Sequence, residues 1–254
     1  MRLAFLGLAP TLLVVAVLLG GASSAGIYAN AVLQMAAALV IAGVLLVPGR
    51  GSDSGEHGLV AILVAVVVLA LVQLVPLPPA VWTALPGRGI VAETYALAGI
   101  APGWRPLTLS PAGTIGATLA MLPVIAAALI GLRAPRGGVT AAFGAIMLAT
   151  CAAVVLGLAQ RATGQQSAFY LYQITNRGYA VGFFANGNHF ATLCALALPA
   201  TAAFLAAAAG RIRSRIRWLI LLTVIAVAAL GIAFSGSLAG IGLVGALRMR
   251  RSGS

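Results

Sequence analysis

Long uncharged stretches alternate with short polar segments along nearly the whole chain. Because each helical residue adds about 1.5 Å, roughly 20 apolar residues cross the hydrocarbon core of a bilayer, which is about 30 Å thick. Seven stretches approach that length, and each ends at arginine, proline, glycine or a polar loop. The sequence therefore predicts an all-α fold, a polytopic transmembrane helical bundle that forms one domain over residues 1–254. The predicted spans are 3–20, 27–47, 58–75, 112–132, 139–159, 189–209 and 218–234.

The two ends of the chain each allow a second interpretation. The small residues GGASSAG after the first stretch would suit a signal peptide cleaved near Ala25, but the uncharged stretch 27–47 follows at once and favours an uncleaved hairpin. The last stretch, 238–247, covers only about 15 Å. It is either a short or truncated eighth helix or the end of one tilted span from 218 to 247.

Composition places the chain in the membrane class. It is 62% hydrophobic and only 7% charged, whereas soluble domains carry about 25% charged residues. The net charge of +12 comes from arginines that lie in short segments between apolar stretches. This distribution is typical of orientation signals beside membrane spans and argues against a nucleic-acid partner. Both cysteines lie within apolar stretches, so neither a disulfide framework nor a metal site is predicted, and no cofactor is expected.

The arginines also predict an orientation. With a cytoplasmic N-terminus, eight arginines before residue 218 lie on the inner side and four on the outer side, although the outer loops are longer. The positive-inside rule then places the chain in a bacterial inner membrane with loops 76–111 and 160–188 in the periplasm. The inner arginines are Arg2, Arg50, Arg133, Arg136, Arg211, Arg213, Arg215 and Arg217, and the outer ones are Arg88, Arg105, Arg161 and Arg177.

The first large loop, 76–111, contains Trp82, Tyr95 and Trp104, residue types that are enriched at the membrane–water boundary. Within it, 81–85 and 90–97 are predicted to form short surface helices. On the opposite side, the run RIRSRIR is predicted to be a topology signal and a patch for anionic lipid.

The second large loop leads into the densest polar and aromatic cluster of the chain, NRGYAVGFFANGNHF. It directly precedes a membrane-length apolar stretch, which predicts a site held at the membrane surface. The candidate binding residues are Arg177, Asn186, Asn188, His189, Arg161 and Tyr179.

Several short motifs resemble those of the bacterial O-antigen ligase and O-antigen polymerase family. The stretch GFFANGNHFATLCALALP is similar to the family's pattern of a glycine, an aromatic residue and two asparagines before an Ala/Leu-rich helix that ends in proline. The segments PLPPAVWTALPGR, WRPLTLSPAGT and GGASSAGIYANAVLQ also resemble segments of one branch. FSGSLAG resembles a family turn, with Leu238 where arginine is common.

The resemblance implies glycosyl transfer at the periplasmic face, from a polyprenyl-diphosphate-linked glycan donor to a lipid A-core or glycan acceptor. Arginine suits such chemistry because its guanidinium binds phosphate oxygens in a bidentate manner and stabilises the departing diphosphate. Members of the family continue with further spans and a large periplasmic loop that supplies essential His and Arg residues. The resemblance thus implies a C-terminally truncated chain that is inactive alone, and no catalytic residue is assigned.

Each candidate residue also has a structural interpretation. Arg177 and Arg161 would anchor the loop to lipid headgroups, Asn186 and Asn188 would cap a helix, and His189 would sit at a helix start. Tyr179 would belong to an aromatic belt. For the whole protein, a non-catalytic structural membrane protein is the main alternative function. A transporter or flippase subunit is less favoured because the spans carry almost no polar or ionisable residues.

Overall fold

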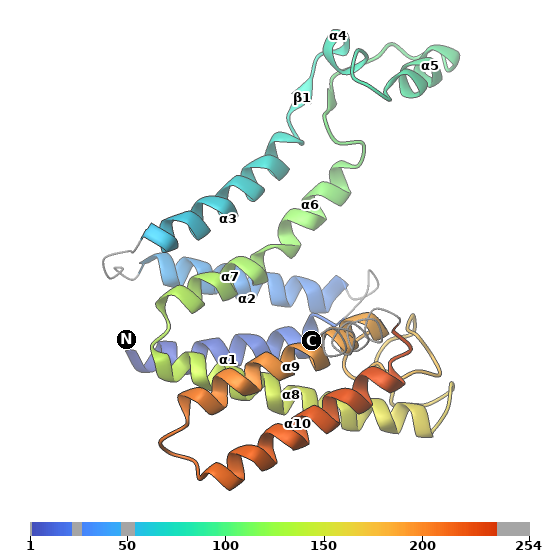
Figure 1. The fold of residues 1–254 in the computed structure, drawn as a ribbon. Helices are drawn as coiled ribbons and strands as arrows, with labels where there is room; N and C mark the ends of the chain where they lie inside the picture. Colours follow the sequence, from blue (N-terminus) through green and yellow to red (C-terminus); the bar gives the residue numbers. More distant parts are fainter. Residues whose placement is uncertain (1, 22–26, 47–53, 238–254) are drawn as a thin grey trace, which may run out of the picture. The chain divides into compact units, whose positions relative to one another are not determined.

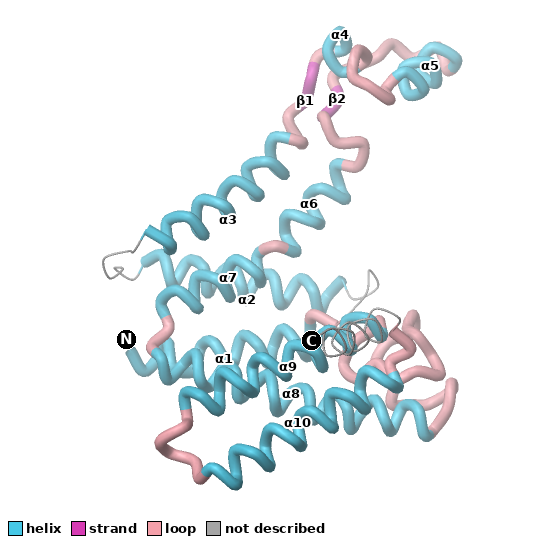
Figure 2. The backbone as a smooth tube through the Cα atoms, in the orientation of Figure 1, coloured by secondary structure: helices cyan, strands magenta, loops and turns pink. Residues whose placement is uncertain are grey.

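The computed structural model describes residues 2–21, 27–46 and 54–237, and most of them are helical (Figures 1 and 2). The chain divides into two compact units. The first comprises 1–46 and 126–254, and the second comprises 47–125. Each is described by itself.

The first unit is a helical bundle. Its elements are α1 (Arg2–Leu19), α2 (Ile27–Leu46), most of α7 (Leu122–Arg133), α8 (Arg136–Ala162), α9 (Gly187–Ala207) and α10 (Ser214–Phe234). Helix α8 packs against α1, α9 and α10, and α9 also packs against α10, so these four helices lie side by side in Figure 1.

Small residues let these helices approach closely. A Cβ atom on Gly231 would lie 2.5 Å from the Cys194 sulfur, and one on Gly157 would lie 3.0 Å from the Ala180 methyl group. Phe190, which is fully buried, fills the space between them. Because lipid tails are as apolar as leucine, helices in a membrane associate mainly through such close packing.

Two sets of hydrogen bonds define the ends of this bundle. At one end, the loop between α8 and α9 donates from Ala185 N to Gly21 O (2.8 Å) and from Ala180 N to Phe234 O (2.9 Å). We call this the loop end. Near the other end, Arg133 Nη1 donates to the carbonyl of Val44 (2.7 Å), close to the last residue of α2. Helices α1 and α2 thus form a hairpin between the two ends.

The second unit contains α3 (Ser54–Val72), β1 (Pro76–Leu77), α4 (Pro79–Trp82), α5 (Gly89–Leu97), β2 (Arg105–Pro106) and α6 (Pro111–Ala120), followed by the first residues of α7. The two short strands pair antiparallel, with Pro76 opposite Pro106 and Leu77 opposite Arg105. Helix α5 matches the predicted short helix 90–97, and α4 overlaps the predicted helix 81–85 only at residues 81 and 82, whereas the strand pair was not predicted.

The aromatic residues of this second unit have different roles. Trp82 is fully buried, donates from Nε1 to Gly103 O (2.9 Å) and meets Tyr95 edge to face at 6.2 Å. Trp82 therefore forms the core of this small unit, whereas Trp104 is 66% exposed. A position of these residues at the membrane–water boundary stays a prediction.

The helices confirm the multi-pass membrane class but not the number of spans. Five apolar helices of the described part are long enough to cross a bilayer, at 28–46, 111–133, 136–162, 187–207 and 214–234. The predicted count of seven full spans is not met on this criterion, because the apolar segments Gly7–Leu19 of α1 and His57–Val72 of α3 are shorter. The segment 238–247, predicted as an eighth helix, lies outside the described residues.

Membrane topology follows from counting spans. Since 111–133 and 136–162 both lie between the loop 73–110 and the loop 163–186, we predict that these two loops emerge on the same face. Alkaline phosphatase fused at Gly103 or Thr175 is expected to be active in the periplasm, and fusions at Arg136 or Arg215 to be inactive. Reversed results at any two of these positions would contradict this topology.

Candidate functional site

The loop 163–186 joins α8 to α9 without regular structure (Figure 2). In addition to its backbone hydrogen bonds to Gly21 and Phe234, it is held to the bundle by the side chain of Gln160. Gln160 is fully buried. Its amide nitrogen donates to Phe169 O (3.0 Å) and Gly182 O (2.9 Å), and its oxygen accepts from Val181 N (3.0 Å) and Gly182 N (2.9 Å). One side chain therefore satisfies four backbone groups of the loop, which are costly to bury unpaired.

Tyr170 is a second buried side chain that forms hydrogen bonds with the backbone of the same loop. Its side chain is buried, and its hydroxyl donates to Tyr179 O (3.0 Å) while accepting from Gly178 N (2.8 Å). Gly178 has φ +85°, a left-handed conformation that favours glycine. The NRGY turn therefore has one fixed conformation.

The two arginines predicted to bind phosphate contact this turn. Arg161 Nη1 donates to the carbonyl of Gly178, and Arg177 Nη1 donates to Gln165 O at 2.9 Å. The Arg177 guanidinium also lies 5.4 Å from the centroid of the Tyr170 ring, a cation–π arrangement. Both guanidinium groups thus stabilise the loop itself, and their contact with a diphosphate stays a prediction.

Two asparagines cap the start of α9. Asn186 has an extended backbone, and its Oδ1 accepts from Asn188 N (2.8 Å), so the N-cap interpretation holds for Asn186. Asn176 Oδ1 accepts from Gly187 N at 2.9 Å. The first amides of α9, which have no partner within the helix, are thereby satisfied from the loop.

A small polar pocket opens beside this helix start, with a volume of about 190 Å³. It brings together three of the predicted residues, Tyr179, Asn186 and Asn188, whereas Arg161, Arg177 and His189 do not line it. We call it the asparagine pocket. Its lining residues are Asn176, Tyr179, Asn186, Gly187, Asn188, Ser235 and Gly236.

The prediction missed Asn176, Ser235 and Gly236. Asn176 begins the NRGY motif, and its carboxamide could have identified it as a candidate binding residue from the sequence. Ser235 and Gly236 belong to the FSGS turn after α10, roughly sixty residues away in sequence, and no local pattern connects them with the asparagines. They reach the pocket because α9 and α10 pack side by side.

Glycines permit the close contact between these segments. A Cβ on Gly187 would lie 2.4 Å from Ser235 O, and one on Gly236 would lie 2.4 Å from the Tyr179 ring. Gly236 also has φ +68°. Any larger side chain at either position would push the walls of the asparagine pocket apart.

His189 lies in the first turn of α9, outside the pocket. Its imidazole is exposed and meets the Phe184 ring edge to face at 6.4 Å. This arrangement agrees with the structural interpretation of a residue at a helix start. A role as a general base stays a prediction.

The described residues that line the asparagine pocket are neutral. Their side chains are amides, a phenol and a hydroxyl, and no charged side chain is among them. In the loop nearby, burial raises the pKa of the Tyr172 phenol above its usual value of 10.0. Within the described ranges, no three His, Cys, Asp or Glu residues lie close enough to hold a metal ion. The pocket is therefore suited to hydrogen bonding with an uncharged, hydroxyl-rich ligand.

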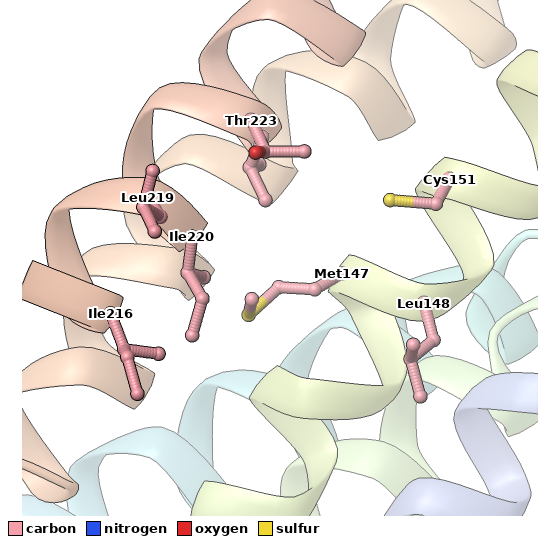
Figure 3. Close-up of a pocket in the computed structure, with 8 residues that line it drawn as sticks. Met147, Leu148, Cys151, Ile216, Leu219, Ile220 and Thr223 are labelled. Atoms are coloured by element: carbon pink, nitrogen blue, oxygen red, sulfur yellow. The ribbon is translucent and has the colours of Figure 1, made fainter. Parts of the chain in front are cut away.

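A second cavity, of about 290 Å³, lies between α8 and α10 (Figure 3). Figure 3 shows Met147 extending from α8 toward Ile220 of α10. The only polar atoms among its side chains are the Thr223 hydroxyl and two sulfurs. The lining of this cavity is therefore predominantly apolar and suits hydrocarbon. It is lined by Met147, Leu148, Cys151, Ile216, Leu219, Ile220, Thr223 and Val224.

Comparisons of the chain with protein-family models, with curated protein sequences and with solved structures gave no match.

Proposed function

We propose that this chain is an O-antigen ligase-like protein of the bacterial inner membrane that holds the saccharide of a polyprenyl-diphosphate-linked donor at the periplasmic face. One observation carries the proposal. The asparagines of the GFFANGNHF motif, on which the family resemblance rests, line a defined polar pocket together with Tyr179 and the FSGS turn.

The chemistry of the asparagine pocket supports a saccharide as its ligand. Each carboxamide offers two donors and an acceptor, which match the mixed donor and acceptor character of sugar hydroxyls. The Tyr179 ring is about half exposed and presents an apolar face beside these amides. A diphosphate would instead require cations, and none is among the described residues that line the pocket.

The same neutrality favours binding over catalysis by the described residues. Transfer to a lipid A-core or glycan acceptor requires a group that stabilises the departing diphosphate and a base near the acceptor hydroxyl. Neither is among the side chains that line the asparagine pocket. A non-catalytic membrane protein that holds a glycan is therefore the second candidate function.

Asn188→Ala tests the proposal, because the Asn188 side chain lines the pocket and is exposed to a ligand. Loss of one or two net hydrogen bonds corresponds to roughly a tenfold weaker affinity. The measurement is binding of a polyprenyl-diphosphate-linked oligosaccharide to the purified chain in lipid nanodiscs. Gln166→Ala, which removes an exposed carboxamide from the same loop outside the pocket, should leave the affinity unchanged.

Competition identifies which part of the donor is recognised. The free oligosaccharide should displace the labelled donor, and polyprenyl phosphate without sugar should not. Displacement by polyprenyl phosphate alone, or equal affinities of the two variants, would contradict a saccharide pocket at this position.

A further inference from the structure

A third cavity, of about 230 Å³, lies between the last turns of α9 and the first turns of α10, toward the opposite end of the bundle from the loop 163–186. It combines apolar walls with one cation and one hydroxyl. We call it the Arg217 pocket. Its lining residues are Leu205, Ala206, Ser214, Arg217, Trp218 and Leu221.

Arg217 carries an unexplained donor in this pocket. Its side chain is partly buried, and its Nε atom is buried without any hydrogen-bond partner among the described residues. A buried donor without an acceptor destabilises a protein, and native structures rarely retain one. An acceptor from outside the chain would satisfy this nitrogen.

The surroundings of Arg217 favour an anionic acceptor. Helix α10 begins at Ser214, one of the pocket's lining residues, without a side-chain cap, so its first amides have no partners within the helix. Helix N-termini attract negative charge, and phosphate in particular. Arg211, Arg213 and Arg215 add positive charge, and the segment RIRSRIR contains no acidic residue.

The apolar walls indicate what else the ligand contains. Leu205 and Leu221 line the pocket together with Trp218, whose indole is 62% exposed. Trp is typical of the membrane–water boundary, where a lipid carries its phosphate above its acyl chains. A ligand with an anionic head and a hydrocarbon tail matches this combination, whereas free phosphate would leave the apolar walls unused.

We propose that the Arg217 pocket binds the phosphate headgroup of one anionic phospholipid. The phosphate contacts the Arg217 guanidinium and the first turn of α10, and an acyl chain lies along Trp218 and Leu221. A specific site and a diffuse basic patch differ in which arginines of the segment contribute to lipid binding. In a patch, every arginine of the segment contributes alike, whereas in a site Arg217, the one that lines the pocket, dominates.

The test compares two variants that lose the same charge. Full-length chain in phosphatidylcholine nanodiscs is titrated with phosphatidylglycerol brominated on its acyl chains, which quenches nearby tryptophan. Quenching of the wild type should saturate at a low mole fraction, and Trp218→Phe should remove that component, leaving Trp82 and Trp104. Arg217→Gln should shift the midpoint about tenfold, and Arg213→Gln less than twofold.

Two further measurements determine whether the ligand is an anionic lipid or free phosphate. Inorganic phosphate at millimolar concentration should not compete, and brominated phosphatidylcholine should give only non-saturable quenching. Equal shifts for Arg217→Gln and Arg213→Gln would overturn the site in favour of a diffuse patch. Displacement by inorganic phosphate would overturn the lipid as ligand. Because the asparagine pocket is not involved, glycan binding should be the same in all of these variants.

Discussion

Replacing Gln160 with leucine is expected to detach the loop 163–186 from the bundle. Leucine has a similar volume but no polar atoms, so the four hydrogen bonds of the Gln160 amide are lost at once. The backbone groups of Phe169, Val181 and Gly182 would then be left without these partners. At roughly 1–3 kcal/mol for each buried group that stays unpaired, the loop should lose about 3 kcal/mol or more.

Limited proteolysis of right-side-out vesicles measures this effect. The loop 163–186 should resist cleavage in the wild type and be cut many times faster in Gln160→Leu. Gln166→Leu is the matched control, because it makes the same substitution at an exposed position of the same loop. Equal cleavage rates in the two variants would show that Gln160 does not fix the loop.

The role of Gln160 also shows what the sequence could not reveal. In the linear chain, this residue is only the first polar one after an apolar stretch, and its partners Val181 and Gly182 follow about twenty residues later. A buried amide in a membrane helix is informative only when the backbone that it binds is known. The contacts of Arg161 and Arg177 could not be read from the sequence either. Their residue type suggested phosphate as a ligand, whereas in the structure both side chains donate to backbone carbonyls of the loop.

Other features were predictable because their physical basis is local. Apolar stretches of membrane length form helices regardless of their neighbours, and an asparagine before such a stretch caps it, as Asn186 does. The number of spans was less predictable, because α3 ends at Val72, three residues before the predicted end of that span, at a turn that hydropathy does not measure. For Trp82, residue type alone suggested a place at the membrane–water boundary. Its burial in the core of the second unit results from tertiary contacts that the sequence does not show.

Substituting alanine for Gly236 is expected to disrupt the asparagine pocket. The substitution has two costs. A residue with a Cβ is strained at φ +68°, by about 1–2 kcal/mol, and the new methyl group would lie 2.4 Å from the Tyr179 ring. Because that ring forms one wall of the pocket, its displacement would change the shape of the pocket.

The variant Gly164→Ala separates the effect of the backbone strain from the effect of the steric clash. Gly164 has φ +83°, and nothing lies within 4 Å of the position of its Cβ, so this variant carries the backbone strain without the clash. Both variants should lower the melting temperature of the purified chain, with the larger decrease in Gly236→Ala. Affinity for the polyprenyl-diphosphate-linked oligosaccharide should fall at least tenfold in Gly236→Ala and stay near wild type in Gly164→Ala. If Gly236→Ala lowers the melting temperature without a loss of affinity, the Tyr179 wall does not contact the glycan. If Gly236→Ala and Gly164→Ala have equal melting temperatures, the Tyr179 ring accommodates the methyl group.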